Sequence, residues 1–567
     1  MARPRTLPEA LAQAAQSQAG YIFVASGRET RRSYTEIYAA SRRVSRALRA
    51  LGLGHGDLVA LVVGDAEQFL TTLFGASVAG VIPASLYPPA TTSDLPRYLA
   101  ATAGILRSCG ARAVVTTAGL QPHFDKLRSS CRDLSFVLAC ETLEALDAPE
   151  SGPQPAVSAE DTAFVQFTSG STSVPKGVVV THRNLSANIE AFSGPAGVGS
   201  STSDRAVSWL PMYHDMGLVG MAIGAVYGRL SAVLLTPQAF VKRPVEWLRA
   251  ISRYRGTVSF APNFAYDLAV RRVKETDLEG LDLSSWRVAG CGAEPIHAPT
   301  LAAFAEKFGP VGFRETSFLP SYGLAEHVLA ATFSPRGRGA RVERLSCDDL
   351  SGQRVATSAM NGSTGEHVTV VSCGLPLPGH EIRITDEQGR PLPERAIGEI
   401  TLAGPSVTPG YYRDAELTAR TIRDGWLHTG DVGYLANGEL FVCGRVKDII
   451  IINGRKYHPQ DLEWGIDDLA GIRRGRVVAF GTVDRGRADR AVIVVEPSGT
   501  VPADVLTDAI RRRIVDLYGL LVDDVLLVPR GTVARTTSGK VRRAATKMRY
   551  ERGEIEVAAA GQTGLYA

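Results

Sequence analysis

Short apolar runs alternate with segments of helical periodicity through the first part of the chain. Residues 33–53 carry apolar side chains at helical spacing, residues 58–63 form an apolar run of strand length, and residues 66–78 are helical again. The same rhythm continues at residues 81–86, 113–116 and 135–139. Because a helix between two strands returns the chain to the same end of the sheet, this order predicts parallel strands flanked by helices. We therefore expect an α/β fold.

The length and composition indicate a globular protein of more than one domain. With 567 residues, the chain exceeds what one hydrophobic core usually supports. Its 45% hydrophobic and 21% charged residues exclude a disordered or fibrous protein. Residues 379–384 and 398–402 have the pattern of strands in a small β-rich subdomain. We expect a large N-terminal domain of mixed and parallel sheets flanked by helices, with this small β-subdomain, followed by a smaller, mobile α+β C-terminal domain.

Charge, cysteine usage and hydropathy restrict the partners and the compartment. Lys and Arg number 62 against 58 Asp and Glu, a net charge of +4 without a polybasic block, so we expect no nucleic-acid partner. Seven cysteines without a Cys-x-x-Cys pair favour a reducing cytoplasm over a disulfide framework. No apolar run approaches the roughly 18 residues of a membrane span, so we expect no stable membrane insertion. We expect a cytoplasmic monomer or weak dimer.

Residues 168–177 read Thr-Ser-Gly-Ser-Thr-Ser-Val-Pro-Lys-Gly and lie between two apolar runs of strand length. Glycine lets backbone N–H groups turn toward an anion, hydroxyls add neutral donors, and Lys176 supplies a positive charge. This composition predicts a loop that holds a polyphosphate. Because Lys176 is followed by Gly177 and a second strand, the loop does not fit the motif of P-loop kinases and GTPases. A Ser/Thr-rich hairpin turn explains the loop alone equally well.

Polar or charged residues follow short apolar runs at several places further along. Residues 209–220 hold His214 and Asp215 at the head of an apolar helix, and residues 290–295 place two glycines after a strand. Ligands of α/β proteins bind beyond the carboxyl ends of strands, where such glycines lie. A lone histidine on such an apolar segment is more often structural than catalytic. For Tyr322, Glu326 and Lys540, each taken alone, a core aromatic, a helix-end charge and a solvated loop are equally good interpretations.

Five segments taken together resemble the motifs of the acyl-adenylate-forming superfamily, which contains acyl-CoA synthetases, luciferases and the adenylation domains of peptide synthetases. They occur in the order of that superfamily and cover nearly the whole chain, which leaves little room for a chance match. The segments are residues 168–177, Tyr-Gly-Leu-Ala-Glu at 322–326, Thr-Gly-Asp at 429–431, Gly-Arg-Val-Lys-Asp at 444–448 and Ser-Gly-Lys at 538–540.

Within the superfamily, the chain is similar to the fatty acyl-AMP ligases. Such ligases carry an inserted segment between the Tyr-Gly…Glu motif and the small β-subdomain, and residues 334–372, rich in Gly, Ser, Arg and Asp, give room for it. The similarity rests on residues 80–89, 211–218, 261–266 and 458–461.

The resemblance implies two domains and a hinge between them. Residues 1–446 would bind AMP and the acyl group, and residues 447–567 would form the mobile domain that carries the catalytic lysine. Lys447 stands where the superfamily has its hinge. Rotation about it would bring Lys540 into the site for adenylation and withdraw it for acyl transfer.

The implied reaction joins a carboxylate to the α-phosphorus of ATP and expels pyrophosphate, with ATP and Mg²⁺ as cofactors. Because like charges must be brought together, cations and oriented donors should dominate the site. Lys540 would bridge the substrate carboxylate and the α-phosphate, Glu326 would hold Mg²⁺, and Asp431 would accept from both ribose hydroxyls. The catalytic candidates are Lys540, Glu326 and His214.

The same resemblance implies how the nucleotide is held. The loop at 168–172 and Lys176 would bind the β- and γ-phosphates, while Tyr322 and the backbone of residues 292–294 would enclose adenine. Arg445 would add a ribose or phosphate contact. The ATP-binding candidates are Thr168, Ser169, Gly170, Ser171, Thr172, Lys176, Gly292, Ala293, Glu294, Ser321, Tyr322, Gly323, Asp431 and Arg445.

A fatty acyl chain needs a dry tunnel with a polar mouth, and His214 is a candidate gate there. Two details depart from the pattern of the superfamily. His327 follows Glu326 where a small residue or Thr is expected, and residues 533–535 lack a proline that is common before Ser-Gly-Lys. The acyl-binding candidates are Trp209, Met212, Met216 and Phe264.

We expect the protein to convert a fatty acid to its acyl-adenylate and pass the acyl group to the phosphopantetheine thiol of an acyl carrier protein, in a polyketide or lipopeptide pathway. The insertion at 334–372 favours this carrier acceptor, because it is expected to brace the large domain against the rearrangement that CoA use requires. A fatty acyl-CoA ligase and an adenylating enzyme for an aromatic or other unusual acid are the alternatives. A silent nucleotide-binding module is disfavoured because Lys540, Glu326 and Asp431 are all present.

Overall fold

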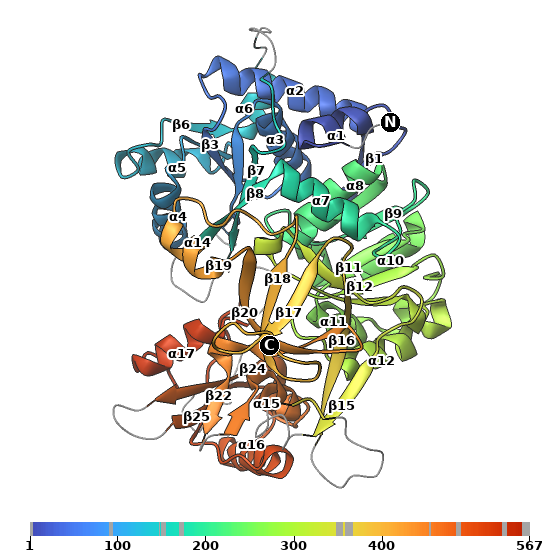
Figure 1. The fold of residues 1–567 in the computed structure, drawn as a ribbon, viewed down its shortest axis with the longest axis vertical. Coiled ribbons are helices and arrows are strands. Elements are labelled where there is room, and N and C mark those ends of the chain that lie inside the picture. Colours follow the sequence, from blue (N-terminus) through green and yellow to red (C-terminus); the bar gives the residue numbers. More distant parts are fainter. Residues whose placement is uncertain are drawn as a thin grey trace.

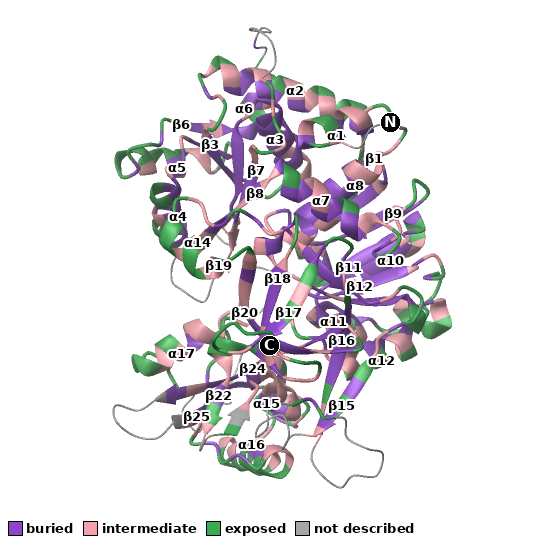
Figure 2. Ribbon diagram, viewed as in Figure 1, coloured by how far each residue is buried: buried purple, intermediate pink, exposed green. Residues whose placement is uncertain are grey.

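Two large sheets and a smaller C-terminal part make up the fold (Figure 1). The computed structural model describes residues 4–25, 27–89, 95–146, 148, 155–168, 175–346, 355–357, 367–452, 455–483, 489–535 and 541–557. In Figure 2, the strands of both large sheets are mainly buried, whereas exposed residues line the outer surfaces of helices such as α16 (Ala503–Tyr518).

The first sheet has six strands in the order β6-β5-β3-β4-β7-β8. All neighbours are parallel except β7 and β8, which form an antiparallel hairpin. Val59 and Leu61 point into one hydrophobic core, whereas Ala60 and Val62 point into another, so this sheet is buried on both faces. The strands are β3 (Leu58–Val62), β4 (Ile82–Ser85), β5 (Ala113–Thr116), β6 (Phe136–Ala139), β7 (Thr162–Thr168) and β8 (Lys176–Thr181). The parallel α/β arrangement expected from the sequence is confirmed.

Helices connect these strands and cover the sheet. Helix α2 begins with a capping box, in which Ser33 accepts from the backbone of Glu36 and the Glu36 side chain accepts from the backbone of Ser33. The helical segments here are α1 (Leu7–Ala14), α2 (Tyr34–Ala50), α3 (Ala66–Val78), α4 (Leu95–Cys109), α5 (Gln121–Asp125), η1 (Lys126–Ser129) and α6 (Cys140–Ala145).

The second large sheet changes direction in its middle. From β1 through β10, β9, β11 and β12 to β13, the neighbours are parallel, and β2 closes this end as an antiparallel edge strand. Beyond β13 the pairings are antiparallel. The strands are β1 (Gly20–Ala25), β2 (Arg28–Ser33), β9 (Arg205–Ser208), β10 (Ser231–Leu235), β11 (Val258–Ala261), β12 (Val288–Cys291), β13 (Phe318–Gly323), β14 (Ala330–Phe333), β15 (Val342–Ser346), β16 (His367–Pro376), β17 (Glu381–Thr385), β18 (Gly398–Ala403), β19 (Ile422–Arg423), β20 (Trp426–Ala436) and β21 (Glu439–Arg445).

Aromatic side chains form the core between this sheet and its helices. Trp247 and Trp286 are fully buried with ring centroids 5.1 Å apart, and Phe304 lies 6.1 Å from Trp286. The indole N–H of Trp247 donates to Ser259 Oγ at 2.9 Å, so its polar atom is satisfied. The helical segments are α7 (His182–Ser193), the π-helical η2 (Met216–Ile223), α8 (Gly224–Gly228), α9 (Pro237–Lys242), α10 (Val245–Tyr254), α11 (Asn263–Arg272), η3 (Glu275–Asp277), α12 (Ala298–Phe308), η4 (Gly309–Val311), η5 (Glu315–Ser317), η6 (Ala325–His327) and α14 (Ala415–Thr421).

The chain after β21 builds a core of its own. Ile493 and Ile510 belong to a buried cluster that is separate from the cores of the two large sheets. The predicted hinge, Lys447, is exposed in the single turn η7 (Val446–Asp448), so the predicted boundary at 446/447 falls in this turn. The elements are β22 (Ile450–Ile452), β23 (Arg455–Tyr457), α15 (Pro459–Ile466), β24 (Ile472–Val483), β25 (Asp489–Pro497), α16, β26 (Asp524–Leu527) and α17 (Arg543–Glu551). The division into a fixed and a mobile domain stays a prediction.

Among the described helices, none combines the length and the apolar character that crossing a membrane requires.

A strand lies inside the segment at 334–372 that the sequence presents as irregular. β15 pairs antiparallel with β16, and its residues alternate between exposed and buried. Glu343 is one of the inward-facing residues and is only 9% exposed. A buried carboxylate within β15 interrupts the apolar alternation that would have indicated a strand.

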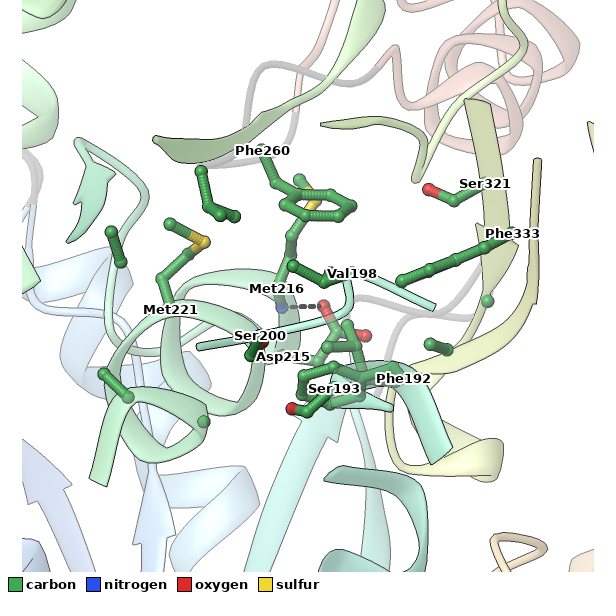
Figure 3. A pocket seen from close by; sticks show the side chains of 18 of the residues that line it. Phe192, Ser193, Val198, Ser200, Asp215, Met216, Met221, Phe260, Ser321 and Phe333 are labelled. Atoms are coloured by element: carbon green, nitrogen blue, oxygen red, sulfur yellow. Dashed lines mark hydrogen bonds between the residues drawn. The ribbon is translucent and has the colours of Figure 1, made fainter. Parts of the chain in front are cut away.

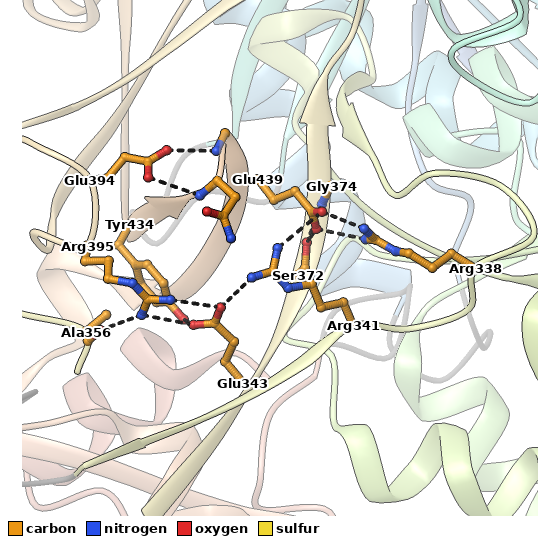
Figure 4. Close-up of polar contacts among 12 residues, drawn as sticks. Arg338, Arg341, Glu343, Ala356, Ser372, Gly374, Glu394, Arg395, Tyr434 and Glu439 are labelled. Carbon is orange, nitrogen blue, oxygen red and sulfur yellow. Dashed lines mark hydrogen bonds and ion pairs between the residues drawn. The ribbon is translucent and has the colours of Figure 1, made fainter. Parts of the chain in front are cut away.

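A network of ion pairs fixes this strand to the antiparallel part of the sheet (Figure 4). Arg338 donates twice to Glu439, at 2.6 and 2.8 Å, and Ser372 also donates to that carboxylate. Arg341 contacts both Glu439, at 3.3 Å, and Glu343, at 2.7 Å. Bidentate pairs to a nearly buried carboxylate are stronger than pairs between two exposed side chains. The network therefore joins the inserted segment to β16 and β21.

Glu439 should contribute to stability in a pH-dependent way. Burial raises the pKa of this carboxyl, but Arg338, Ser372 and Arg341 more than offset that effect and leave the pKa at about 2, below its ordinary 4.5. A carboxyl with a depressed folded-state pKa stabilises the fold fully above the unfolded-state value, and this contribution is lost as the pH falls toward about 2.

We predict that Glu439→Gln lowers the free energy of unfolding at pH 7 by about 2 kcal/mol. In thermal unfolding followed over pH, the gap between wild type and variant should narrow as the pH falls below about 4.5. Glu381→Gln, on an exposed carboxylate of β17 whose side chain is 69% accessible, is the control and should change little. A gap that is independent of pH would contradict this assignment.

Candidate active site

The candidate site lies where the second sheet changes from parallel to antiparallel. β13 pairs parallel with β12 through Pro320 and antiparallel with β14 from Ser321 onward. The predicted residues Ser321, Tyr322 and Gly323 are therefore at the carboxyl end of a parallel strand, where α/β sheets bind ligands. The loop after β12, which holds Gly292 and Ala293, lies against them.

Backbone segments approach closely at this edge. A Cβ atom on Gly292 would lie 2.7 Å from both the carbonyl oxygen and the Oγ of Ser321, so only glycine fits there. Ala293 follows with φ of 67°, a left-handed conformation that costs energy in a residue with a side chain. The carboxylate of Glu294 accepts from the backbone N–H of Phe264 at 2.6 Å and so ties this loop to the start of α11.

Tyr322, Asp431 and Arg445 meet in one polar cluster. Tyr322 donates to Asp431 Oδ2 at 2.7 Å, and Arg445 Nε donates to Asp431 Oδ1 at 2.9 Å. Asp431 and Arg445 face each other in the register of β20 and β21. Burial, together with the charge of Asp431, raises the pKa of Tyr322 well above its ordinary value. The tyrosine is therefore a neutral hydrogen-bond donor.

In a second cluster, Lys176 and Glu326 both lie against Tyr411. Tyr411 donates to Glu326 Oε1 at 2.7 Å, and the Lys176 ammonium lies 5.7 Å from the centre of the Tyr411 ring. Burial and the charge of Glu326 both raise the pKa of Tyr411. Sequence reasoning missed Tyr411, for which two adjacent tyrosines after Pro409-Gly410 are the sole signal.

The two ends of the predicted phosphate loop lie within the described residues. Thr168 and Lys176 pair across the base of the β7–β8 hairpin, so the chain runs strand, loop, strand as the sequence indicates. The remaining loop candidates and the catalytic lysine lie outside the described residues, and their roles stay predictions. They are Ser169, Gly170, Ser171, Thr172 and Lys540.

An apolar cavity that is partly open to solvent adjoins the nucleotide candidates. Ala293, Ser321, Tyr322 and Gly323 form one part of its wall. Figure 3 shows the aromatic side chains of Phe192, Phe260 and Phe333 and the thioether side chains of Met216 and Met221 around the rest of it.

One of the four acyl-binding candidates lines the cavity. Met216 lines it, at the start of π-helical η2, a geometry that is frequent at functional sites. Trp209, Met212 and Phe264 are not among its described lining residues. Trp209 instead stacks on Phe240 at 3.8 Å and contacts the Phe264 ring edge-on at 6.1 Å.

His214 directly precedes a residue that lines this cavity. Its ring centroid is 5.3 Å from that of Tyr213. The lining residue is its neighbour Asp215, whose Oδ1 accepts from the backbone N–H of Met216 at 2.7 Å. The role of His214 as a gate stays a prediction.

The unexpected His327 contacts a second histidine in the interior of the protein. Its side chain is fully buried and packs on His380 with ring centroids 4.9 Å apart. Burial, helped by His380, lowers the pKa of His327 to about 3, so the imidazole is uncharged beside Glu326.

Comparison with known proteins places the chain in a family. The AMP-binding enzyme family matches residues 11–412. A putative acyl-CoA synthetase of Caulobacter vibrioides is 36% identical over 529 residues, which cover 92% of this chain and 90% of the relative. The medium-chain-fatty-acid–[acyl-carrier-protein] ligase JamA of Moorena producens is 33% identical over 546 residues, 92% of this chain and 90% of that protein.

A solved structure from a study of fatty acyl-adenylate ligases of E. coli and L. pneumophila superposes with a TM-score of 0.91. It shares 38% sequence identity and covers 97% of this chain and 98% of its own. Both the sequence matches and this structure extend over nearly the full length of the two proteins compared. The chain therefore belongs to the AMP-binding enzymes of the acyl-adenylate-forming superfamily.

Proposed function

We propose that the protein activates a fatty acid with ATP to an acyl-adenylate, releases pyrophosphate, and transfers the acyl group to the phosphopantetheine thiol of an acyl carrier protein. The observation that carries this proposal is the apolar cavity, whose wall includes three of the candidate nucleotide-binding residues, Ala293, Ser321 and Tyr322. Such a cavity would hold an aliphatic chain and leave its carboxylate at the polar end, beside the nucleotide.

The nucleotide would bind along the edge of β13. Tyr322 and the strained loop at Gly292 and Ala293 would enclose the adenine, since the glycine lets the two backbones approach closely. Asp431 would accept from the ribose hydroxyls, because a carboxylate has about four acceptor positions, and Tyr322 and Arg445 occupy one position on each oxygen.

Adenylation forms a bond between a carboxylate oxygen of the acid and the α-phosphorus of ATP, and it breaks the bond from that phosphorus to the bridging oxygen of pyrophosphate. Both reactants are anions, so positive charge near the phosphates lowers the barrier. Lys176, held over the Tyr411 ring, is the described lysine that would face the β- and γ-phosphates. Lys540 would bridge the attacking carboxylate and the α-phosphate.

The residues fit a Mg²⁺ ion bound together with ATP. No group of three or more His, Cys, Asp and Glu side chains gathers into a metal site within the described ranges. Mg²⁺ in nucleotide sites is held by one or two carboxylates and by phosphate oxygens. Glu326 supplies one such carboxylate, with Oε1 already oriented by Tyr411. When bound, the ion would neutralise negative charge on the phosphates.

The inserted segment favours a carrier protein as the acceptor. Arg338 and Arg341 attach it to β21 through the nearly buried carboxylate of Glu439 (Figure 4). An insertion fixed in this way would oppose the rearrangement of the C-terminal domain that CoA use requires, which favours a carrier protein. A CoA ligase is the second candidate, and it is supported by the Caulobacter relative named as a putative acyl-CoA synthetase.

Comparing the two thiol acceptors separates these candidates. With purified enzyme, ATP and a straight-chain fatty acid, we expect hydroxylamine to trap the acyl-adenylate and a phosphopantetheinylated carrier protein to accept the acyl group. CoA at the same concentration should yield little thioester. Efficient acyl-CoA formation, measured by mass spectrometry, would reject the carrier acceptor while leaving adenylation intact.

Lys540→Ala should slow adenylation without removing ATP binding. Loss of a charge that stabilises the transition state typically costs about 100-fold or more in rate, so ATP–pyrophosphate exchange should fall by that factor. The ATP dissociation constant, measured by calorimetry, should change only a few-fold. Lys547→Ala, on α17 of the same domain, is the control for general effects. Exchange at the wild-type rate in Lys540→Ala would refute the assigned role.

The cavity should set the acyl chain length. Gly220 lines it, and a Cβ there would meet only the movable Leu329 side chain, at 3.0 Å. Gly220→Leu would fill part of the cavity, so the ratio of kcat/KM for long over short fatty acids should fall by about 10-fold or more. Gly104→Leu on α4, where a Cβ would meet no atom within 4 Å, is the control away from the cavity lining. An equal loss with all acids would contradict the assignment of this cavity to the acyl chain.

A further inference from the structure

The turn that carries Glu326 contains a strained backbone conformation. Val328 has φ of 63° and ψ of −58°, and the backbone N–H of Leu329 donates to the carbonyl of His327 at 2.7 Å. These features define a γ-turn of the positive-φ type, which is rare and strained, especially for a β-branched residue. Strain of this kind persists only where the surroundings hold it in place.

His327 is the residue that holds this turn from the inside. Its side chain is 0% exposed, and Nδ1 lies 2.9 Å from the carbonyl oxygen of Ala330. Because a carbonyl only accepts, Nδ1 carries the proton. The hydrogen bond therefore spans the turn, from the residue before Val328 to the residue two positions after it.

A buried polar network supports the same turn from helix α7. The Asn188 amide donates to the Ala330 carbonyl at 2.8 Å and accepts from the Ala330 N–H at 3.1 Å. It also donates to Ser406 Oγ at 3.0 Å, and Ser406 lies 2.6 Å from Nε2 of His380, the ring that packs on His327. Asn188 and Ser406 are both 0% exposed. Fully buried networks of this kind hold their members in one geometry.

Glu326 is on the outer side of this turn. Its backbone carbonyl accepts from the N–H of Thr408 at 3.0 Å, and its carboxylate accepts from Tyr411 at 2.7 Å. The carboxylate is thus fixed at its tip by Tyr411 and at its base by the backbone of η6. The base depends on the turn that His327 and Asn188 hold.

We propose that His327 is a positioning residue that locks the γ-turn at Val328 and thereby orients the Glu326 carboxylate toward the Mg²⁺–phosphate site. It contacts neither substrate nor metal and acts only through Glu326. The inference rests on the proposed role of Glu326 in Mg²⁺–ATP binding. It gives a function to the imidazole that stands where the superfamily pattern has a small residue or Thr.

Three variants and one control test the proposal. His327→Phe keeps a ring of similar size and removes the N–H donor, whereas His327→Asn keeps a donor near the position of Nδ1. Glu326→Gln removes the carboxylate charge. His182→Phe is the control, since His182 is also a buried histidine, and its Nδ1 accepts from the backbone of Leu7 at 3.1 Å.

The first readout is ATP binding by titration calorimetry with Mg²⁺ or with EDTA. Wild type should bind ATP more tightly with Mg²⁺. His327→Phe and Glu326→Gln should both lose most of this gain, His327→Asn should recover it, and His182→Phe should retain it. If His327→Phe retains the gain while Glu326→Gln loses it, the positioning role is wrong and the role of Glu326 stands. If Glu326→Gln retains the gain, the proposed role of Glu326 fails, and the positioning role fails with it.

The second readout is the double variant in ATP–pyrophosphate exchange. We expect each of His327→Phe and Glu326→Gln to reduce the rate by about 10-fold or more. Because His327 acts through Glu326, the double variant should be no slower than Glu326→Gln alone. Independent effects that multiply in the double variant would overturn the proposal. Thermal unfolding of all variants beside His182→Phe separates these effects from a general loss of stability.

Discussion

The hydrogen bond from Tyr322 to Asp431 joins the parallel part of the second sheet to its antiparallel part. Tyr322 lies just beyond the parallel-paired part of β13, and Asp431 belongs to the antiparallel strand β20, so the bond spans the edge at which the sheet changes direction. The cavity, the strained Ala293 and the turn that carries Glu326 all adjoin this edge. A change that separated the two strands would disturb these parts together.

Adenylation brings two anions together, and the charged groups of the site are fixed in advance. Asp431 is compensated by Arg445, and Glu326 accepts from Tyr411, so each carboxylate is held in a fixed direction before any ligand arrives. Such preorganisation avoids the cost of reorienting dipoles during the reaction. In the proposed function, the apolar cavity next to these groups would keep water from the acyl chain and so strengthen the electrostatic interactions at its polar end.

Much of the fold could be predicted because its signals are local. The buried run of β3 is apolar on both faces, and the glycine at 292 precedes a left-handed turn that leaves room for Ser321. The missed features depend on tertiary partners. The buried Glu343 hides strand β15, because Arg395 neutralises it from a distant position together with the neighbouring Arg341. Tyr411 joins the site only through the pairing of its loop with β8. For the same reason, the sequence could not show that Met216 lines the cavity whereas Trp209 stacks on Phe240.

The central claim is that the edge of β13 and the adjoining cavity are the site at which a fatty acid is converted to its acyl-adenylate. ATP–pyrophosphate exchange over a panel of carboxylic acids of different length and type, with mass-spectrometric detection of acyl-AMP, tests it most directly. We expect straight-chain fatty acids to support exchange and to give acyl-AMP, with aromatic acids far less active. ATP binding without exchange or acyl-AMP for any acid in the panel would contradict the account.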